Sequence, residues 1–270
     1  MAKGVLVDIS KCIGCKACQV ACKQWNDLPA KIPEFEDGLT GPPDMDGDTY
    51  TVVKFKVLEM DGDYKIRSAK TQCMHCQHPA CVSACFAKAL QKDPKTGAVI
   101  YYPHLCVGCR YCMLACPFDI PKYQWEKTFP LVAKCQFCFD LEGKYDRLSY
   151  GLQPACVDTC ITGALTFGER DELLREAWNR IGSDPTYIKK VLGEKEAGGT
   201  SWLYISDVPF ENFGFRPNLG TRPLPEYSHD FLKYTPVIAL GWGTLLTVLY
   251  HYTKRREQIA SDSSNKDVHM

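Results

Sequence analysis

The residues of this chain whose type and spacing could carry chemistry are its 16 cysteines, which fall into four groups. The third group is the most regular: Cys106, Cys109, Cys112 and Cys116 are spaced Cys-x2-Cys-x2-Cys-x3-Cys, and Pro117 follows them. In this spacing three thiolates hold one cubane 4Fe-4S cluster, and the fourth serves a neighbouring cluster. The group therefore predicts iron–sulfur clusters that lie side by side.

The other three groups repeat or vary this spacing. The first matches the third, the second is spaced x2, x4, x3, and the fourth is split into two pairs by a long irregular loop. Structural zinc is the alternative, because it also binds four-cysteine sites, and the split fourth group resembles a zinc site most. We favour clusters at all of them. These groups are Cys12, Cys15, Cys18 and Cys22; Cys73, Cys76, Cys81 and Cys85; and Cys135, Cys138, Cys156 and Cys160.

Four 4Fe-4S clusters are expected, one for each group of four cysteines. The groups should work in pairs, because the last cysteine of one group should serve the cluster of its partner group. The second and third groups are close in sequence and are paired here, which leaves the first with the fourth. Pairing the first with the second, and the third with the fourth, is the competing assignment. The predicted ligand sets are Cys12, Cys15, Cys18 and Cys160 (cluster 1); Cys22, Cys135, Cys138 and Cys156 (cluster 2); Cys73, Cys76, Cys81 and Cys116 (cluster 3); and Cys85, Cys106, Cys109 and Cys112 (cluster 4).

Each predicted cluster has four thiolates, so all sixteen cysteines bind iron and no iron keeps an open site. Such clusters suit outer-sphere electron transfer. We find no catalytic dyad, nucleophile elbow or phosphate-binding loop in the sequence, and we expect a subunit that is not catalytic by itself. Lys+Arg and Asp+Glu are equal at 32 each, which argues against nucleic acid as a partner.

Short strands, loops and helices are expected to position the cysteines. Strands are predicted at Gly4–Asp8, Ala98–Tyr102 and Trp202–Ile205, and a hairpin at Tyr50–Met60 and Tyr64–Ser68, with Val53, Phe55 and Val57 on one buried face. A helix is predicted at Glu169–Ile181, with Leu173, Leu174, Trp178 and Ile181 on its apolar face. Asp207–His229, with its prolines, is predicted to be extended.

The expected fold class is α+β: two ferredoxin-like lobes of two clusters each, a hairpin insertion and one C-terminal transmembrane helix. The predicted divisions are residues 1–168 for the clusters, with the insertion at about 30–70, and residues 169–232 for a helix and an extended docking segment. A transmembrane helix at 233–253 and a polar, disordered cytoplasmic tail at 254–270 complete the chain.

The span is predicted from Tyr234–Thr253, which has no Asp, Glu, Lys or Arg and is about long enough to cross a bilayer. A buried core helix is the alternative. Tyr234, Tyr250 and Tyr252 suit the membrane interfaces. Small residues at Ala239, Gly243 and Thr247 form a face on which another membrane helix can pack.

The charges beside the span predict its direction. Lys254-Arg255-Arg256 mark the cytoplasmic end, so the cluster domain is expected outside the cytoplasm. No signal peptide is expected before the first cysteine group. Since clusters are assembled in the cytoplasm, the domain is expected to cross the membrane folded, together with a partner that carries a twin-arginine signal.

Three histidines were considered as further candidates. His75 and His78 lie inside the second cysteine group and are expected to be loop residues at a partner surface. His251 is expected to be an interfacial anchor, with haem or quinone contact as the alternative. Lys134, beside Cys135, is expected either to stabilise an electron on the nearby cluster or to be solvated.

The four cysteine groups, in this order, resemble the electron-transfer (beta) subunits of the molybdopterin oxidoreductase superfamily. Ile9–Cys22 followed by Trp25-Asn26-Asp27, and the single C-terminal span, are similar to respiratory formate dehydrogenase beta subunits. The resemblance implies the same cluster pairing. It also implies a relay of electrons between a molybdenum or tungsten catalytic subunit and a membrane cytochrome b and quinone.

Similarity to other subunits of this architecture leaves more than one candidate for the catalytic partner subunit. Ile161 follows Cys160 where relatives often have proline. Ser201–Phe215 also resembles the anchored iron–sulfur subunits of membrane-bound nickel–iron hydrogenases. A nickel–iron large subunit is therefore the alternative partner, and polysulfide or DMSO reductase types are further alternatives. A zinc scaffold without redox function is the alternative of a different class.

Overall fold

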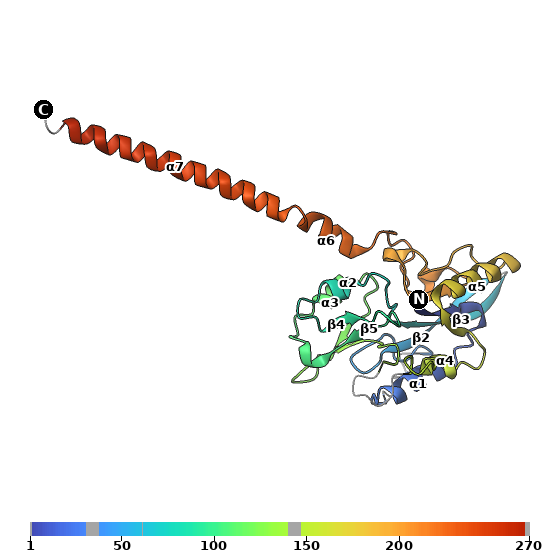
Figure 1. Ribbon diagram of the computed structural model, residues 1–270. Helices are drawn as coiled ribbons and strands as arrows, with labels where there is room; N and C mark the ends of the chain where they lie inside the picture. Colours follow the sequence, from blue (N-terminus) through green and yellow to red (C-terminus); the bar gives the residue numbers. More distant parts are fainter. Residues whose placement is uncertain (1, 31–37, 61, 140–146, 268–270) are drawn as a thin grey trace. The chain divides into compact units, whose positions relative to one another are not determined.

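The computed structural model describes residues 2–30, 38–60, 62–139 and 147–267. It forms two compact units, Met1–Pro225 and Glu226–Met270, which are described separately here (Figure 1). Parts of the predicted insertion, of its turn, of the loop in the fourth cysteine group and of the tail lie outside the described residues. The structure contains both helices and strands, as the predicted α+β class requires.

A three-stranded sheet organises the first unit. The central strand is β1 (Lys3–Asp8), which pairs antiparallel with β8 (Leu165–Glu169) and parallel with β9 (Trp202–Ile205). Side chains alternate along β1, since Leu6 packs on one face with the apolar side of a helix while Val5 and Val7 pack on the other with the main core. Both faces are buried, and the strands predicted at β1 and β9 are confirmed.

The helix on one face of this sheet is α5 (Arg170–Ser183). Leu173, Ala177 and Ile181 are its buried residues, at a spacing of four, and they pack with Leu6 of β1. The prediction that Trp178 belongs to the apolar face is wrong, since this side chain is 42% exposed. A stripe at i, i+4, i+8 is narrow, and Trp178 lies one position beyond it.

The predicted hairpin is present as β2 (Thr51–Met60) and β3 (Asp63–Gln72), which pair antiparallel over their whole length. Val52, Val53 and Ala69 at the inner end are buried, whereas Val57 is exposed. The predicted buried face therefore holds only for the inner half. The outer half extends away from the core towards solvent.

Four short helices carry cysteines: α1 (Ala17–Trp25), α2 (Ala80–Ser83), α3 (Tyr111–Ala115) and α4 (Ala155–Asp158). Helix α1 packs against α4, and α2 against α3. Two small antiparallel pairs lie near them, β4 (Leu90–Lys92) with β5 (Val99–Tyr101), and β6 (Lys122–Tyr123) with β7 (Val132–Ala133). In Figure 1, α2, α3, β4 and β5 lie together. The packing thus joins the first cysteine group to the fourth and the second to the third.

Single helical turns connect these elements at Ile9–Lys11, Pro103–Leu105, Glu196–Gly198 and Phe210–Phe213. The last of these, and α6 (Leu224–Leu232), fall within the segment predicted to be extended, so that prediction is wrong there. Proline fits the start of a helix, where its missing N–H has no intrahelical partner. Pro209 precedes the turn at Phe210, and Pro225 is the second residue of α6.

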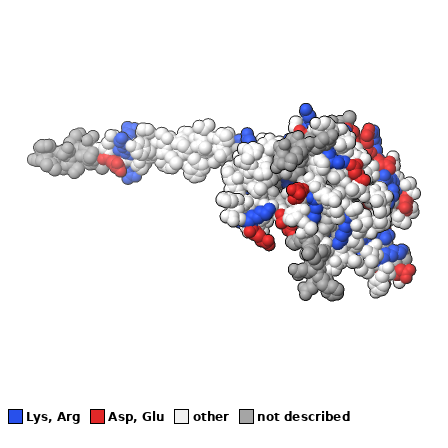
Figure 2. All heavy atoms as spheres, turned by 90° about the horizontal axis from the view of Figure 1, so that it is seen from below, with Lys and Arg blue, Asp and Glu red and all other residues white. Residues whose placement is uncertain are grey.

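The second unit consists of most of α6 and of α7 (Thr235–Asp267). One stretch, Leu224–Ile259, has a mean hydropathy of 1.3 over its most apolar window and is long and apolar enough to cross a membrane. Its side chains are exposed, which opposes the alternative of a buried core helix. Figure 2 shows a long section of this helix without charged residues, followed by a charged end. The helix continues to Asp267, so the tail predicted to be disordered is helical up to that residue.

We predict that Leu173→Ala destabilises the first unit by about 2–5 kcal/mol, because it removes a buried side chain between α5 and β1. Trp178→Ala, which deletes a larger but exposed side chain of the same helix, should cost less than about 1 kcal/mol. The comparison is the apparent Tm of the cluster-loaded full chain in detergent, measured by circular dichroism. Equal losses would contradict the observed orientation of α5.

Candidate metal centres

The first cavity lined by cysteines contains Cys12, Cys15, Cys18 and Cys160. The first three come from the loop before α1 and from α1 itself, and the fourth follows α4. Contact between α1 and α4, together with pairing of β1 and β8, brings these distant parts of the chain together. Ser68 of β3 donates a hydrogen bond to the Cys12 sulfur at 3.2 Å.

A second cavity is lined by Cys22, Cys135, Cys138 and Cys156. Cys22 extends from α1 and Cys156 from α4, so α1 contributes a cysteine to each cavity, and α4 and the residues that follow it do the same. Several N–H groups donate to sulfurs of this set: Asn26 to Cys22 at 3.5 Å, Phe137 to Cys135 at 3.4 Å, and Ala155 to Cys138 at 3.4 Å. Such donors stabilise thiolates and contribute to the reduction potential of a bound cluster.

The remaining cysteines form two further neighbourhoods. Burial, then the charges of Cys73, Cys116 and Cys81, raise the pKa of the Cys76 thiol well above its ordinary value. Burial, then the charges of Cys106, Cys85 and Cys109, raise the pKa of Cys112 to about 11. The electrostatic neighbours of Cys76 and of Cys112 thus belong to the third and the fourth predicted set, and the assignment of ligands to four clusters stays a prediction.

The four sets follow one another in space. Cys18 of the first set is close enough to Cys156 of the second for their charges to interact, and Cys135 of the second set interacts with Cys73 of the third. Cys81 of the third set interacts in turn with Cys112 of the fourth. The order of neighbours is thus first, second, third, fourth.

The loops that present the cysteines depend on left-handed backbone turns. Gly14 and Gly108 both have φ +71, and they precede Lys16 and Arg110, which adopt φ +59 and +62 at the N-caps of α1 and α3. A Cβ on Gly14 would lie 2.3 Å from the Phe55 ring, so this position needs glycine for space as well as for conformation. The sequence suggests the glycine turns, but Lys16 and Arg110 carry no such signal.

The cysteine sets suit a group larger than a single ion. Tetrahedral zinc with Zn–S bonds of about 2.3 Å requires sulfurs about 3.8 Å apart. Within the described ranges, no group of three or more His, Cys, Asp or Glu side chains is placed to hold one ion. Four cysteines line each of the two cavities, which fits the four-thiolate ligation of a 4Fe-4S cluster.

An orphaned polar atom supports the same conclusion. The Trp202 side chain is fully buried and lines the second cavity, and its Nε1–H has no hydrogen-bond partner among the described residues. Indole nitrogen can only donate. The sulfurs of a bound cluster would supply the missing acceptors in this cavity.

Several of these thiols lie in poor environments for a free thiolate. Burial raises the pKa of Cys18 and of Cys138 to about 12, and that of Cys135 to about 11. Thiolate is the form that binds metal, so binding releases protons, and the cation must offset the cost of burying the charge. Iron is therefore part of what makes these buried groups stable.

Lys70 is a site residue that the sequence analysis missed. It lies on β3, is 2% exposed, and lines both the first and the second cavity. Burial acts to lower its pKa, but the charges of Cys156, Cys18, Cys135 and Cys22 together raise it. A lysine in the middle of a strand carries no sequence signal for this position.

The other candidates have mixed outcomes. His75 is fully buried, which overturns its placement at a partner surface, whereas His78 is exposed. His75 Nδ1 accepts from the Val99 N–H at 2.9 Å, and burial, then the charges of Lys134, Lys92 and Lys70, lower its pKa well below its ordinary value. Lys134 is buried rather than solvated, and its Nζ donates to the carbonyls of Val99 and Cys135. His251 lies exposed on α7.

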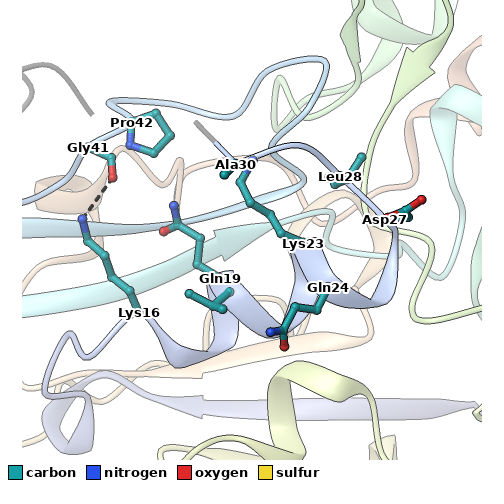
Figure 3. A pocket seen from close by; sticks show the side chains of 10 residues that line it. Lys16, Gln19, Lys23, Gln24, Asp27, Leu28, Ala30, Gly41 and Pro42 are labelled. Atoms are coloured by element: carbon teal, nitrogen blue, oxygen red, sulfur yellow. Dashed lines mark hydrogen bonds between the residues drawn. The ribbon is translucent and has the colours of Figure 1, made fainter. Parts of the chain in front are cut away.

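A further cavity of about 500 Å³ lies along α1 (Figure 3). Polar and apolar residues both line it, and Lys16 donates to the Gly41 carbonyl across it at 3.0 Å. None of its ten described lining residues is cysteine, so it is not one of the candidate cluster sites.

Comparison with known proteins gives a family model and several relatives. Residues 65–170 match the model of a 4Fe-4S dicluster domain, which includes the second and third cysteine groups and all of the fourth. A protein of Nitratidesulfovibrio vulgaris is 44% identical over 98% of this chain and 70% of its own length. The hydrogenase-2 operon protein HybA of Escherichia coli O157:H7 is 38% identical over 77% of this chain and 71% of its own.

The iron–sulfur subunit of the nitrate-inducible formate dehydrogenase of Escherichia coli is 33% identical over 98% of this chain and 89% of its own length. The corresponding formate dehydrogenase subunit of Haemophilus influenzae is 34% identical over 92% of this chain and 78% of its own. These similarities extend through both compact units.

Cys156 and Cys160 provide a matched test of the two cavities, because they are four residues apart yet line different ones. We predict that Cys160→Ala alters the same EPR signal as Cys12→Ala, and that Cys156→Ala alters the same signal as Cys138→Ala. The measurement is EPR of the reduced full chain, with iron content as a control for assembly. If Cys156→Ala and Cys160→Ala alter one and the same signal, the separation into two sets is wrong.

Proposed function

Because this chain belongs to the family of formate dehydrogenase iron–sulfur subunits, we propose that it relays electrons through four 4Fe-4S clusters between a catalytic subunit and the membrane. As an iron–sulfur subunit of a formate dehydrogenase or hydrogenase type of complex, it transfers electrons and contributes no catalytic residues. We propose in addition that it holds four clusters, with the ligands given above, and that its partners are a catalytic subunit and a membrane subunit.

The observation that carries the proposal is the order of the four cysteine sets. Each set would hold one cluster, which would supply one-electron redox chemistry when bound. Charges of the first and second sets interact, as do those of the second and third and those of the third and fourth. Sites arranged in such a row would let electrons enter at one end from the catalytic subunit and leave at the other end to the membrane subunit, or pass in the reverse direction.

Two ferredoxin-like lobes are part of the proposal. Helices α1 and α4 would frame one lobe with clusters 1 and 2, and α2 and α3 the other with clusters 3 and 4, because these helices pack in those pairs. The β2–β3 hairpin would be the insertion, and it contributes Ser68 and Lys70 to the first lobe. The proposed ligand sets are those of the sequence analysis.

The proposed catalytic partner is a molybdenum or tungsten formate dehydrogenase subunit. Relatives named as formate dehydrogenase subunits cover more of this chain than the hydrogenase operon protein does. A nickel–iron hydrogenase is the second candidate, since HybA has the higher identity, 38% against 33%, and Ser201–Phe215 resembles hydrogenase subunits.

We predict that the full chain, purified from its native membrane, is brown, contains iron and acid-labile sulfide, and brings a large subunit with molybdenum or tungsten. Visible absorption separates clusters from colourless zinc, and metal analysis of the co-purified subunit separates the candidates. Nickel in place of molybdenum or tungsten would assign the hydrogenase alternative. Zinc without sulfide would overturn the electron-transfer role.

The membrane end of the proposal rests on the second unit. Leu224–Ile259 contains the candidate span, and Thr244 and Thr247 donate to the carbonyls of Leu240 and Gly243 in their own helix. Their hydroxyls are thus satisfied without water, as a lipid environment requires. The proposed partner is a cytochrome b subunit, whose helix would pack on Ala239, Gly243 and Thr247.

We predict that the cluster domain lies outside the cytoplasm and that Lys254-Arg255-Arg256 lie inside, as the positive-inside rule requires. Protease added to spheroplasts should then remove the cluster domain, whereas a tag after Met270 should stay protected until the membrane is permeabilised. The domain should fail to cross when the twin-arginine pathway is blocked. A cluster domain that resists protease in intact spheroplasts would contradict this orientation.

A further inference from the structure

Lys70 occupies the partition between two of the candidate cluster sites. It lines the cavity of Cys12, Cys15, Cys18 and Cys160, and also the cavity of Cys22, Cys135, Cys138 and Cys156. In both linings it is accompanied by cysteines, apolar residues and polar side chains, and Lys16 also lines the first cavity. The side chain starts from the buried inner end of β3, where Lys70 pairs with Val53 of β2.

Neutral partners hold the ammonium group in place. Nζ donates to Thr51 Oγ1 at 2.9 Å and to Gln72 Oε1 at 2.8 Å, and it lies 4.6 Å from the centre of a Trp202 ring. These contacts fix the position of the charge and do not cancel it. The charges of four cysteines act on Lys70: Cys156, Cys18, Cys135 and Cys22.

A buried ammonium without a carboxylate is costly unless other negative charge is close. Of the four cysteines that act on Lys70, Cys18 belongs to the first set, and Cys156, Cys135 and Cys22 belong to the second. A role as a hydrogen-bond donor between Thr51 and Gln72 does not require a charge, because a glutamine side chain can also donate. A positive charge at this position is explained by the cysteine-lined cavities on both sides of it, which would hold negative charge.

We propose that Lys70 is a shared electrostatic tuning residue, which stabilises an added electron on either of the first two clusters. Reduction adds one negative charge to a site, and a fixed cation close to both sites favours reduction of both. Removing the cation should move the potentials of clusters 1 and 2 in the same direction. The lysine therefore acts on the free energy of an electron on cluster 1 and on that of an electron on cluster 2 alike. This inference rests on the proposed function, because it requires clusters in the two cavities.

Trp202 provides a contrast within the same region. Trp202 lines the second cavity and is not among the residues that line the first, and its Nε1–H has no partner in the part of the chain that the structure describes. Loss of this donor should therefore affect one potential, whereas loss of the Lys70 charge should affect two. Variants of the two residues therefore distinguish a hydrogen bond to one cluster from an electrostatic effect on two clusters.

The test is a redox titration followed by EPR on the full chain, with Lys70→Gln as the variant that removes the charge and keeps a donor. We expect the potentials of clusters 1 and 2 to become more negative, and those of clusters 3 and 4 to stay unchanged. Lys70→Arg should keep both potentials near their original values. Trp202→Phe should make only the potential of cluster 2 more negative.

Lys56→Met is the matched control, since it removes one exposed lysine charge from the same hairpin and should move no potential. Unchanged potentials in Lys70→Gln, or a shift of one cluster only, would overturn the inference. If Lys70→Gln and Lys70→Met lose the first two clusters while Lys70→Arg keeps them, the charge serves assembly, and the inference is also wrong. Iron and sulfide in the unmodified chain test the proposed function separately.

Discussion

Burial of sulfur ligands in sets of four is the constraint on which the rest of this structure depends. The thiols of Cys18, Cys22 and Cys138 lie where burial opposes a thiolate. Thiolates at these positions would need positive charge nearby, which bound iron would supply and to which the buried Lys70 would add. The core clusters around Val5 and around Leu90 include cysteines among their apolar members, so the metal sites and the hydrophobic core are largely the same part of the molecule.

Very short elements satisfy this constraint because each is fixed by what it packs against. Helices of four or five residues such as α2 and α3 are too short to be stable alone. The β8–β1–β9 sheet holds the two ends of the cluster region together, since β1 leads into the first cysteine group and β8 follows the last. Tyr204 of β9 extends this framework to the hairpin, because its hydroxyl donates to the Lys70 carbonyl and accepts from Gln72.

The sequence was informative where chemistry and local pattern coincide. Cysteine spacing suggested the four sets, and alternation and composition located β1, β9 and the apolar helix. It was less informative where tertiary contacts decide. His75 and Lys70 have polar side chains that would suit a surface, yet both are buried by residues distant in sequence, Phe137 and Trp202 respectively. Trp178 shows the reverse, because a narrow packing face left a large apolar side chain exposed.

The place where the chain leaves the first unit is defined by a close contact at a glycine. Gly198 lies against both Pro223 and His78, and a Cβ there would come within 2.6 Å of the proline. His78 lies between Cys76 and Cys81 in sequence, so the last residues of this unit lie beside the third cysteine set. Residue 198 needs glycine for this close approach, and its φ of +86 also favours glycine, so this contact fixes the end of the first unit beside the loop of the second cysteine group.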